Sequence, residues 1–156
     1  MLVIAIDPGI ERTGYALVEQ DGHSLRAVEY GCIQTASSLP LEQRLVELKQ
    51  DLDALVKSHK PDVAAIERLV FVHNATSALA VGQARGVILL SLHEAGLPVS
   101  EYSPTQVKRA VTQSGAADKD SVGRAVKLVF KLPEIPRPDD AADALALAVC
   151  HASQVQ

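Results

Sequence analysis

The pattern of apolar and polar residues predicts three strands at the start of the chain. Leu2 to Ile6 is continuously apolar, which is typical of a strand buried on both faces. Gly14 to Gln20 and Leu25 to Gln34 follow with strand-like patterns, and the turns at Asp7-Pro8-Gly9 and Asp21-Gly22 separate the segments. We therefore expect a three-stranded meander.

From Leu41 onward the pattern alternates between helices and short strands. Leucines at helical spacing predict a helix from Leu41 to Ser58, and Lys60-Pro61 ends it. Further strands are expected at 62–67 and 98–102, and further helices at 74–94, 103–113, 118–131 and from 138 onward. Strands that follow helices pair in parallel with an earlier strand, so the fold class is α/β.

Carboxylates stand where these buried segments meet solvent. Asp7 and Glu67 end two strands that we expect to be parallel, and such ends share one edge of a sheet. Asp140 and Asp143 are spaced i, i+3 on the last helix, but Asp139 and Asp143 are spaced i, i+4, so spacing does not choose between Asp139 and Asp140. Taken singly, Asp7 before Pro8-Gly9 also fits a turn, and the acids of the last helix also fit a first helical turn whose dipole they complement.

Together these acids predict a metal site. Four carboxylates in one place repel each other strongly and stay ionised only if cations lie among them. Carboxylate oxygens are ligands that Mg²⁺ and Mn²⁺ prefer. Glu67 adds weight, because a glutamate that ends an apolar strand is costly unless it is paired or coordinated.

Composition predicts one domain, residues 1–156, with 47% hydrophobic residues. No apolar run approaches the roughly 18 residues that span a bilayer, and the start lacks the basic segment of a signal peptide. We therefore expect a cytoplasmic protein with no membrane contact. Cys32 and Cys150 lack metal-type spacing and are expected to be buried thiols rather than a disulfide.

The charge is unevenly distributed along the chain. The net charge is −4, yet residues 105–137 carry seven basic and three acidic side chains. On charge alone, solvated faces of amphipathic helices explain this segment well. A basic segment beside an acidic metal pocket also suits a nucleic-acid backbone.

Several motifs occur in order over nearly the whole chain. They are Ile6-Asp7-Pro8-Gly9, Gly14-Tyr15, Ile66-Glu67, Ser77-Ala78-Leu79 with Gly82-Gln83-Ala84-Arg85-Gly86, Gln106-Val107-Lys108, and Asp140-Ala141-Ala142-Asp143-Ala144-Leu145. In these motifs the chain resembles the RuvC family of bacterial Holliday-junction resolvases. The resemblance implies a ribonuclease-H-like fold with a mixed five-stranded sheet flanked by helices. It also implies a homodimeric endonuclease that cuts two opposed strands of a four-way DNA junction, in partnership with a branch-migration complex of the RuvA and RuvB type.

The resemblance also assigns residues. Its four catalytic, metal-binding acids correspond to Asp7, Glu67, Asp140 and Asp143, which favours Asp140 over Asp139. Two Mg²⁺ or Mn²⁺ ions per site are expected to activate the attacking water and stabilise the leaving oxygen, giving 5′-phosphate and 3′-hydroxyl ends.

The DNA-contacting residues are expected in the basic segment and in the loop after Glu67. Related proteins usually carry a base-stacking aromatic three residues after the glutamate, but this chain has Val70 there, so Phe71 either takes that role or packs in the core. The expected contact residues are Phe71, His73, Asn74, Lys108, Lys119 and Arg124.

Small residues at Ala78, Gly82 and Gly86 form a stripe on one helix. Because helical glycine costs about 1 kcal/mol relative to alanine, a packing reason is expected. The stripe fits either helix-to-sheet packing or a dimer interface, and the resemblance favours the dimer.

Three alternative functions also fit parts of the sequence. The Asp-x-Gly start also resembles the first phosphate motif of sugar-kinase and actin-like ATPases, which need a second domain. Ribonuclease-H-like nucleases that process ribosomal RNA precursors share the core fold. A non-catalytic junction-binding module would bind without cutting.

Overall fold

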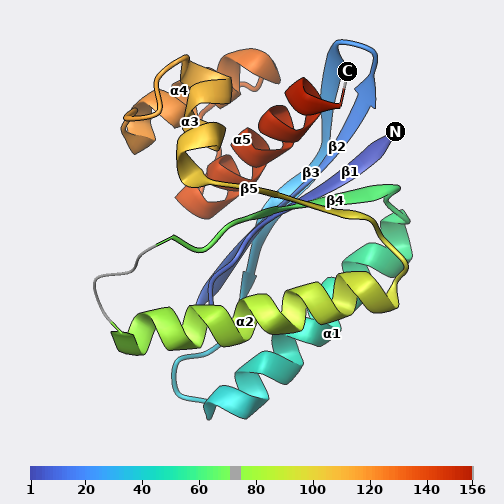
Figure 1. Ribbon diagram of the computed structural model, residues 1–156, viewed down its shortest axis with the longest axis vertical. Helices are drawn as coiled ribbons and strands as arrows, with labels where there is room; N and C mark the ends of the chain where they lie inside the picture. Colours follow the sequence, from blue (N-terminus) through green and yellow to red (C-terminus); the bar gives the residue numbers. More distant parts are fainter. Residues whose placement is uncertain (71–74, 156) are drawn as a thin grey trace.

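The structure is a computed structural model that describes residues 1–70 and 75–155. After an initial meander, helices alternate with strands, and a run of helices ends the described part of the chain (Figure 1). In chain order the described elements are β1 (Leu2–Asp7), β2 (Arg12–Asp21), β3 (Ser24–Gln34), α1 (Leu41–His59), β4 (Val63–Glu67), α2 (Ala75–Glu94), β5 (Val99–Tyr102), α3 (Pro104–Thr112), α4 (Lys119–Val129) and α5 (Asp139–Gln154).

Within the described residues, the strands form one five-stranded sheet in the order β3-β2-β1-β4-β5. β1, β2 and β3 pair antiparallel, which confirms the predicted meander. β4 pairs parallel with β1, and β5 pairs parallel with β4. The mixed α/β sheet predicted from the sequence is thus confirmed.

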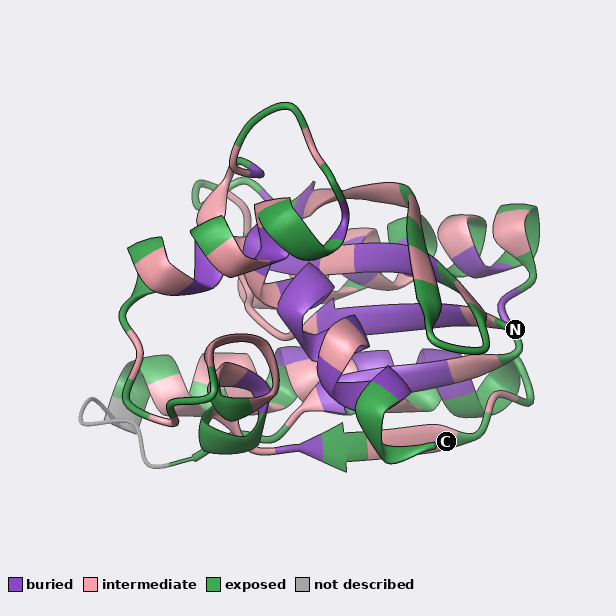
Figure 2. Ribbon diagram, turned by 90° about the horizontal axis from the view of Figure 1, so that it is seen from above, coloured by how far each residue is buried: buried purple, intermediate pink, exposed green. Residues whose placement is uncertain are grey.

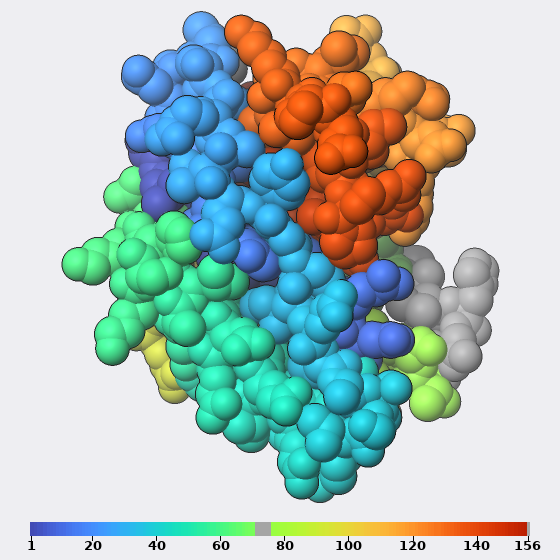
Figure 3. Space-filling view, turned by 180° about the vertical axis from the view of Figure 1, so that it is seen from behind, coloured from blue at the N-terminus to red at the C-terminus, as the bar shows by residue number. Residues whose placement is uncertain are grey.

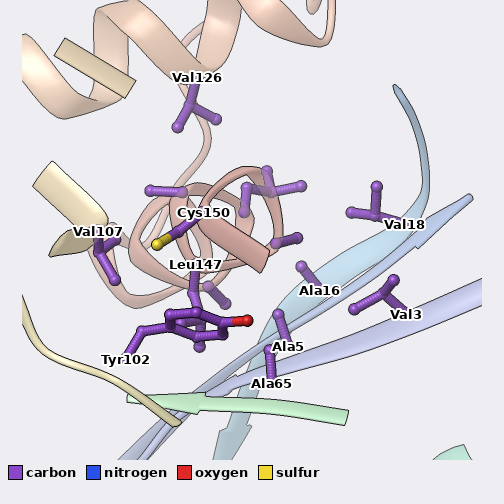
Figure 4. Close-up of a cluster of buried hydrophobic side chains, with 14 of the residues drawn as sticks. Val3, Ala5, Ala16, Val18, Ala65, Tyr102, Val107, Val126, Leu147 and Cys150 are labelled. Carbon is purple, nitrogen blue, oxygen red and sulfur yellow. The ribbon is translucent and has the colours of Figure 1, made fainter. Parts of the chain in front are cut away.

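Helices cover both faces of the sheet, with α3, α4 and α5 on one side and α1 and α2 on the other (Figure 1). Successive β1 residues therefore enter different cores: Val3 and Ala5 face α5, whereas Ile4 and Ile6 lie in the core with α1 and α2. Figure 4 shows Ala5 next to Ala65 on the sheet, on the side of the helix that carries Leu147. This two-sided burial explains why β1 is continuously apolar, and the central strands appear almost wholly buried in Figure 2.

Side-chain caps and turn residues set the helix ends near the predicted positions. Ser103 begins α3 with a reciprocal capping box to Gln106, and Asp118 caps α4 by accepting a hydrogen bond from the Ser121 N–H at 2.8 Å. The end of α4, which the sequence places near Lys131, comes two residues earlier. The helix ends at Val129, because Lys131 takes a left-handed backbone with φ of 53°.

Cys32 on β3 and Cys150 on α5 are free thiols. Cys150 is buried and Cys32 is half-buried. Burial raises the pKa of each thiol to about 11, so both are protonated at neutral pH. Among the described residues, no helix has the length and apolar character needed to cross a membrane.

Candidate active site

Three elements bring four acids to one end of the sheet. Asp7 and Glu67 are the last residues of β1 and β4, and the residues before them, Ile6 and Ile66, are partners in the parallel ladder. Asp140 and Asp143 lie in the first two turns of α5, which packs over β1 and β2. The acids that the sequence placed in one site are therefore neighbours in the fold.

The acids influence one another electrostatically. Burial, followed by the charges of Glu67, Asp143 and Asp140, holds the pKa of Asp7 well above its usual range. Burial and the neighbouring Asp143 raise the pKa of Glu67 to about 7. Burial also raises the pKa of Asp143, with a further contribution from Asp140. The site thus holds more negative charge than its own cations neutralise.

Such a donor set fits a divalent cation. In the part of the chain that the structure describes, no three acid, histidine or cysteine side chains lie close enough to hold a metal ion in the conformation observed. The residues present are nevertheless hard oxygen donors whose mutual repulsion a cation relieves. Asp7 and Glu67 at two strand ends, with Asp140 and Asp143 on the helix over them, are the residues that would hold it.

Asp139 and Asp140 take different surroundings, which bears on the choice that spacing left open. The Asp139 carboxylate accepts a hydrogen bond from Arg137 at 2.7 Å. Asp140 raises the pKa of both Asp7 and Asp143, and its effect on Asp143 is larger than that of Asp139. This arrangement supports Asp140 as the member of the acidic site.

Two lysines from the basic segment face the acids. Lys119, the first residue of α4, lies 4.0 Å from the Asp143 carboxylate and lowers the pKa of Asp7, Glu67 and Asp143. Lys108 on α3 lowers the pKa of Glu67 and Asp143. Both are placed to meet an anion that approaches the carboxylates.

Arg124 lies farther along α4 than Lys119. Its guanidinium donates a hydrogen bond to the Ser121 hydroxyl at 3.3 Å and lowers the pKa of Asp118. Among the described residues, the ion pairs of the site acids are with Arg12 and Lys119 and not with Arg124. The structure therefore does not bring Arg124 to the carboxylates.

The loop after Glu67 borders the site on one side. Val70 lines a cavity of about 100 Å³ together with Asp7 and Glu67. Val70 is 45% exposed, so it does not belong to the core. The predicted DNA contacts Phe71, His73 and Asn74 lie outside the described residues.

Sequence reasoning missed Arg12, the first residue of β2. Its Nε atom lies 3.6 Å from an Asp140 carboxylate oxygen. The approach depends on Gly14, because a Cβ atom there would lie 2.1 Å from the Asp140 carbonyl oxygen. Since Gly14 and Asp140 are 126 positions apart in the chain, no local pattern signals this contact.

The small-residue stripe of α2 is largely open within one chain. A Cβ atom on Gly86 would meet nothing within 4 Å, and one on Gly82 would just reach Leu69. Two leucines of the same helix, Leu79 and Leu90, are 65% and 51% exposed. Packing inside the subunit therefore does not explain why glycine occupies position 86.

Comparison with known proteins identifies close relatives. Residues 3–151 match the family model described as crossover junction endodeoxyribonuclease RuvC. The chain is 47% identical over 155 residues to the protein of that name from Desulfitobacterium hafniense, covering 99% of this chain and 94% of the relative. It is 50% identical over 151 residues to the one from Thermomicrobium roseum, covering 97% and 92%.

Solved structures of Holliday junction resolvases are also similar to this chain. The structure titled T. thermophilus RuvC in complex with Holliday junction substrate superposes with a TM-score of 0.91 at 35% identity, covering 97% of this chain and 93% of that one. The yeast mitochondrial Holliday junction resolvase Ydc2 superposes with a TM-score of 0.69 at 16% identity over 96% of this chain and 78% of that one. The second likeness shows a shared fold, the ribonuclease-H-like fold of these resolvases.

Proposed function

The chain belongs to the RuvC family of crossover junction endodeoxyribonucleases, and from this premise we propose that it resolves Holliday junctions. It is an endonuclease that cuts a four-way DNA junction during recombination and DNA repair. We propose that the cuts are paired, fall symmetrically near the crossover, and leave 5′-phosphate and 3′-hydroxyl ends.

The observation that carries this proposal is the convergence of Asp7, Glu67, Asp140 and Asp143 at one end of the sheet. Burial and mutual repulsion raise the pKa of Asp7 and Glu67, so the site as it stands lacks positive charge. We propose that the four acids hold two Mg²⁺ or Mn²⁺ ions. Bound there, the ions supply the charge that activates water and stabilises the leaving oxygen in phosphodiester hydrolysis.

The protein side chains then position the DNA. Lys119 and Lys108 reach toward the acids from the first residue of α4 and from α3, and their ammonium groups can bind the phosphate that faces the carboxylates. Asp7 ends the central strand β1 and would be one of the residues that hold the ions. Phe71, His73, Asn74 and Arg124 remain predicted DNA contacts.

Two symmetric cuts require two active sites, which a homodimer with a two-fold axis provides on a two-fold substrate. We propose that Ala78, Gly82 and Gly86 on α2 belong to the dimer interface. The open space around Gly86 and the exposed Leu79 support this, because a second subunit can pack against them.

The cellular setting follows from the family. We propose that the protein is bacterial and cytoplasmic, acts as one nuclease domain, and works with a branch-migration complex of the RuvA and RuvB type.

The proposed function is tested by comparing cleavage of three substrates. A labelled mobile four-way DNA junction, the matched linear duplex and an RNA hairpin are incubated with the protein in Mg²⁺, Mn²⁺ or EDTA. The proposal predicts nicks in two opposed strands of the junction only, and only with metal. Cutting of the RNA alone would indicate ribosomal RNA processing, and tight binding without nicks would indicate a binding module.

A further inference from the structure

A second cavity opens beside the acids, on the side of Asp140. It has a volume of about 330 Å³ and is lined by Arg12, Lys119, Arg137, Pro138, Asp139 and Asp140. In Figure 3 the blue loop that precedes β2 reaches the surface beside the orange segment that leads into α5. Segments far apart in the chain therefore bring two arginines to one hollow that adjoins the active site.

The loop that presents Arg12 is held firmly. The Thr13 hydroxyl donates a hydrogen bond to the Gly9 carbonyl at 2.6 Å. The backbone N–H of Thr35 donates to the Glu11 carbonyl at 3.1 Å, and the Thr35 hydroxyl donates to the Ile10 carbonyl. Because Thr13 and Thr35 are themselves buried, these bonds fix the backbone from which the Arg12 side chain extends.

The arginines keep donors available for a ligand. The Arg12 side chain is 52% exposed, and its 3.6 Å separation from Asp140 is longer than a hydrogen bond. Arg137 uses one guanidinium nitrogen to bond Asp139 at 2.7 Å and is otherwise exposed. A guanidinium presents five N–H donors in a planar fork that matches phosphate oxygens.

The charge of the hollow favours an anion. Three cationic and two anionic side chains line it, for a net charge of +1. Both carboxylates already have an arginine partner. Exposed ion pairs of this kind contribute little to stability, so folding alone does not account for the gathering of cations.

Building on the function proposed above, we propose that Arg12 and Arg137 bind a backbone phosphate of the strand being cut, adjacent to the phosphate that faces the four acids. Asp140 belongs to both places, since it repels Asp7 on one side and contacts Arg12 on the other. A strand that places one phosphate at the acids therefore carries the next within reach of the arginines.

The test compares Arg12→Gln, Arg137→Gln and the double variant with wild type and with Arg26→Gln. Arg26 is a matched control, because it is an exposed arginine whose Nε lies 2.9 Å from Glu19. This pair lies toward the end of the β2–β3 ladder that is far from Arg12. Junction affinity is measured across a salt series in EDTA, and kcat and KM are measured with Mg²⁺. Arg12→Lys keeps the positive charge but removes the planar guanidinium group.

Loss of a phosphate contact has a defined signature. Each Gln variant is expected to bind the junction about tenfold more weakly and to lower the slope of log affinity against log salt by about 1. KM rises while kcat changes little, because the contact is equal in ground and transition states. Arg12→Lys retains the salt slope with part of the affinity, and Arg26→Gln matches wild type.

Two results would overturn the proposal. One is that both Gln variants bind the junction with wild-type affinity and with the wild-type slope of log affinity against log salt. The other is a rise in the Mg²⁺ concentration that half-saturates cleavage in Arg12→Gln, with an unchanged salt slope, which would make Arg12 a positioning residue for Asp140. A wild-type protein that neither binds nor cuts the junction would instead refute the proposed function, so the two failures are distinguishable.

Discussion

Gly14 of β2 and Asp140 of α5 touch through their backbones: a Cβ atom on Gly14 would lie 2.1 Å from the Asp140 carbonyl oxygen. A real side chain cannot approach a carbonyl so closely, so α5 can lie at its observed height only over glycine. This contact sets the position of Asp140, and with it the separation of Asp140 from Asp7 on the neighbouring strand.

Gly14→Ala is therefore expected to push the first turn of α5 away from the sheet. Overpacking of this kind costs about 1–3 kcal/mol in the free energy of unfolding, and the displaced Asp140 should lower junction cleavage at least tenfold. Thermal unfolding and single-turnover cleavage check both effects. A variant with wild-type stability and activity would show that the contact is unimportant.

Glu67→Gln is expected to stabilise the metal-free protein at high pH. The pKa of Glu67 rises from 4.5 to about 7 on folding, so the stability it supplies is present below pH 4.5 and lost as the pH rises to about 7. Removing the charge should raise the free energy of unfolding by about 1–3 kcal/mol at pH 8 and change it little at pH 4.5.

Denaturation in EDTA at the two pH values measures this difference. Glu134→Gln, at an exposed glutamate of the loop before α5, serves as the control. It should change the free energy of unfolding by the same amount at both pH values. Mg²⁺ should raise the Tm of wild type more than that of Glu67→Gln, because a ligand stabilises the state that binds it. A Glu67→Gln variant less stable than wild type at pH 8 would contradict the account.

Lys119→Met is expected to shift the pH dependence of cleavage upward. Lys119 lowers the pKa of Asp7, Glu67 and Asp143, so without it these acids ionise at higher pH. The rising limb of the pH profile of kcat/KM should move toward higher pH, together with a lower maximal rate. Arg124→Met, which removes a cation away from the acids, should leave the limb in place; equal profiles for wild type and Lys119→Met would argue against the assigned role.

Gly86→Arg is expected to convert a dimer to a monomer without unfolding it. Nothing in the subunit lies within 4 Å of a Cβ atom at this position, so the arginine disturbs only what packs on α2 from outside. Sedimentation velocity reports the change. Val46→Arg, at a 54% exposed position of α1, is the control that should remain dimeric; a dimeric Gly86→Arg would move the interface elsewhere.

The elements of the fold were predictable because their signals are local. The period of the apolar residues, the Ser103 and Asp118 caps and the turn residues each act over a few positions. Even the meeting of Asp7 and Glu67 followed from a general rule for parallel strands, and the ladder pair Ile6–Ile66 confirms it.

The rest of the site depends on how distant segments pack. Spacing could not choose between Asp139 and Asp140, and only the fold shows that one pairs with Arg137 while the other repels Asp7. The approach of Arg12 to Asp140 rests on the closeness that Gly14 permits. The distribution of charge along the chain likewise could not tell which basic residues face the acids. The fold places Lys119 beside Asp143, whereas Arg124 contacts Ser121.

The measurement that tests the central claim most directly is cleavage and binding of a labelled four-way junction by wild type and Asp7→Asn in the same Mg²⁺ buffer. If the four acids form the metal-dependent centre of a resolvase, wild type nicks two opposed strands at symmetric positions. Asp7→Asn then binds the junction with comparable affinity and makes no nicks. Undiminished cleavage by Asp7→Asn, or by wild type in EDTA, would contradict the account.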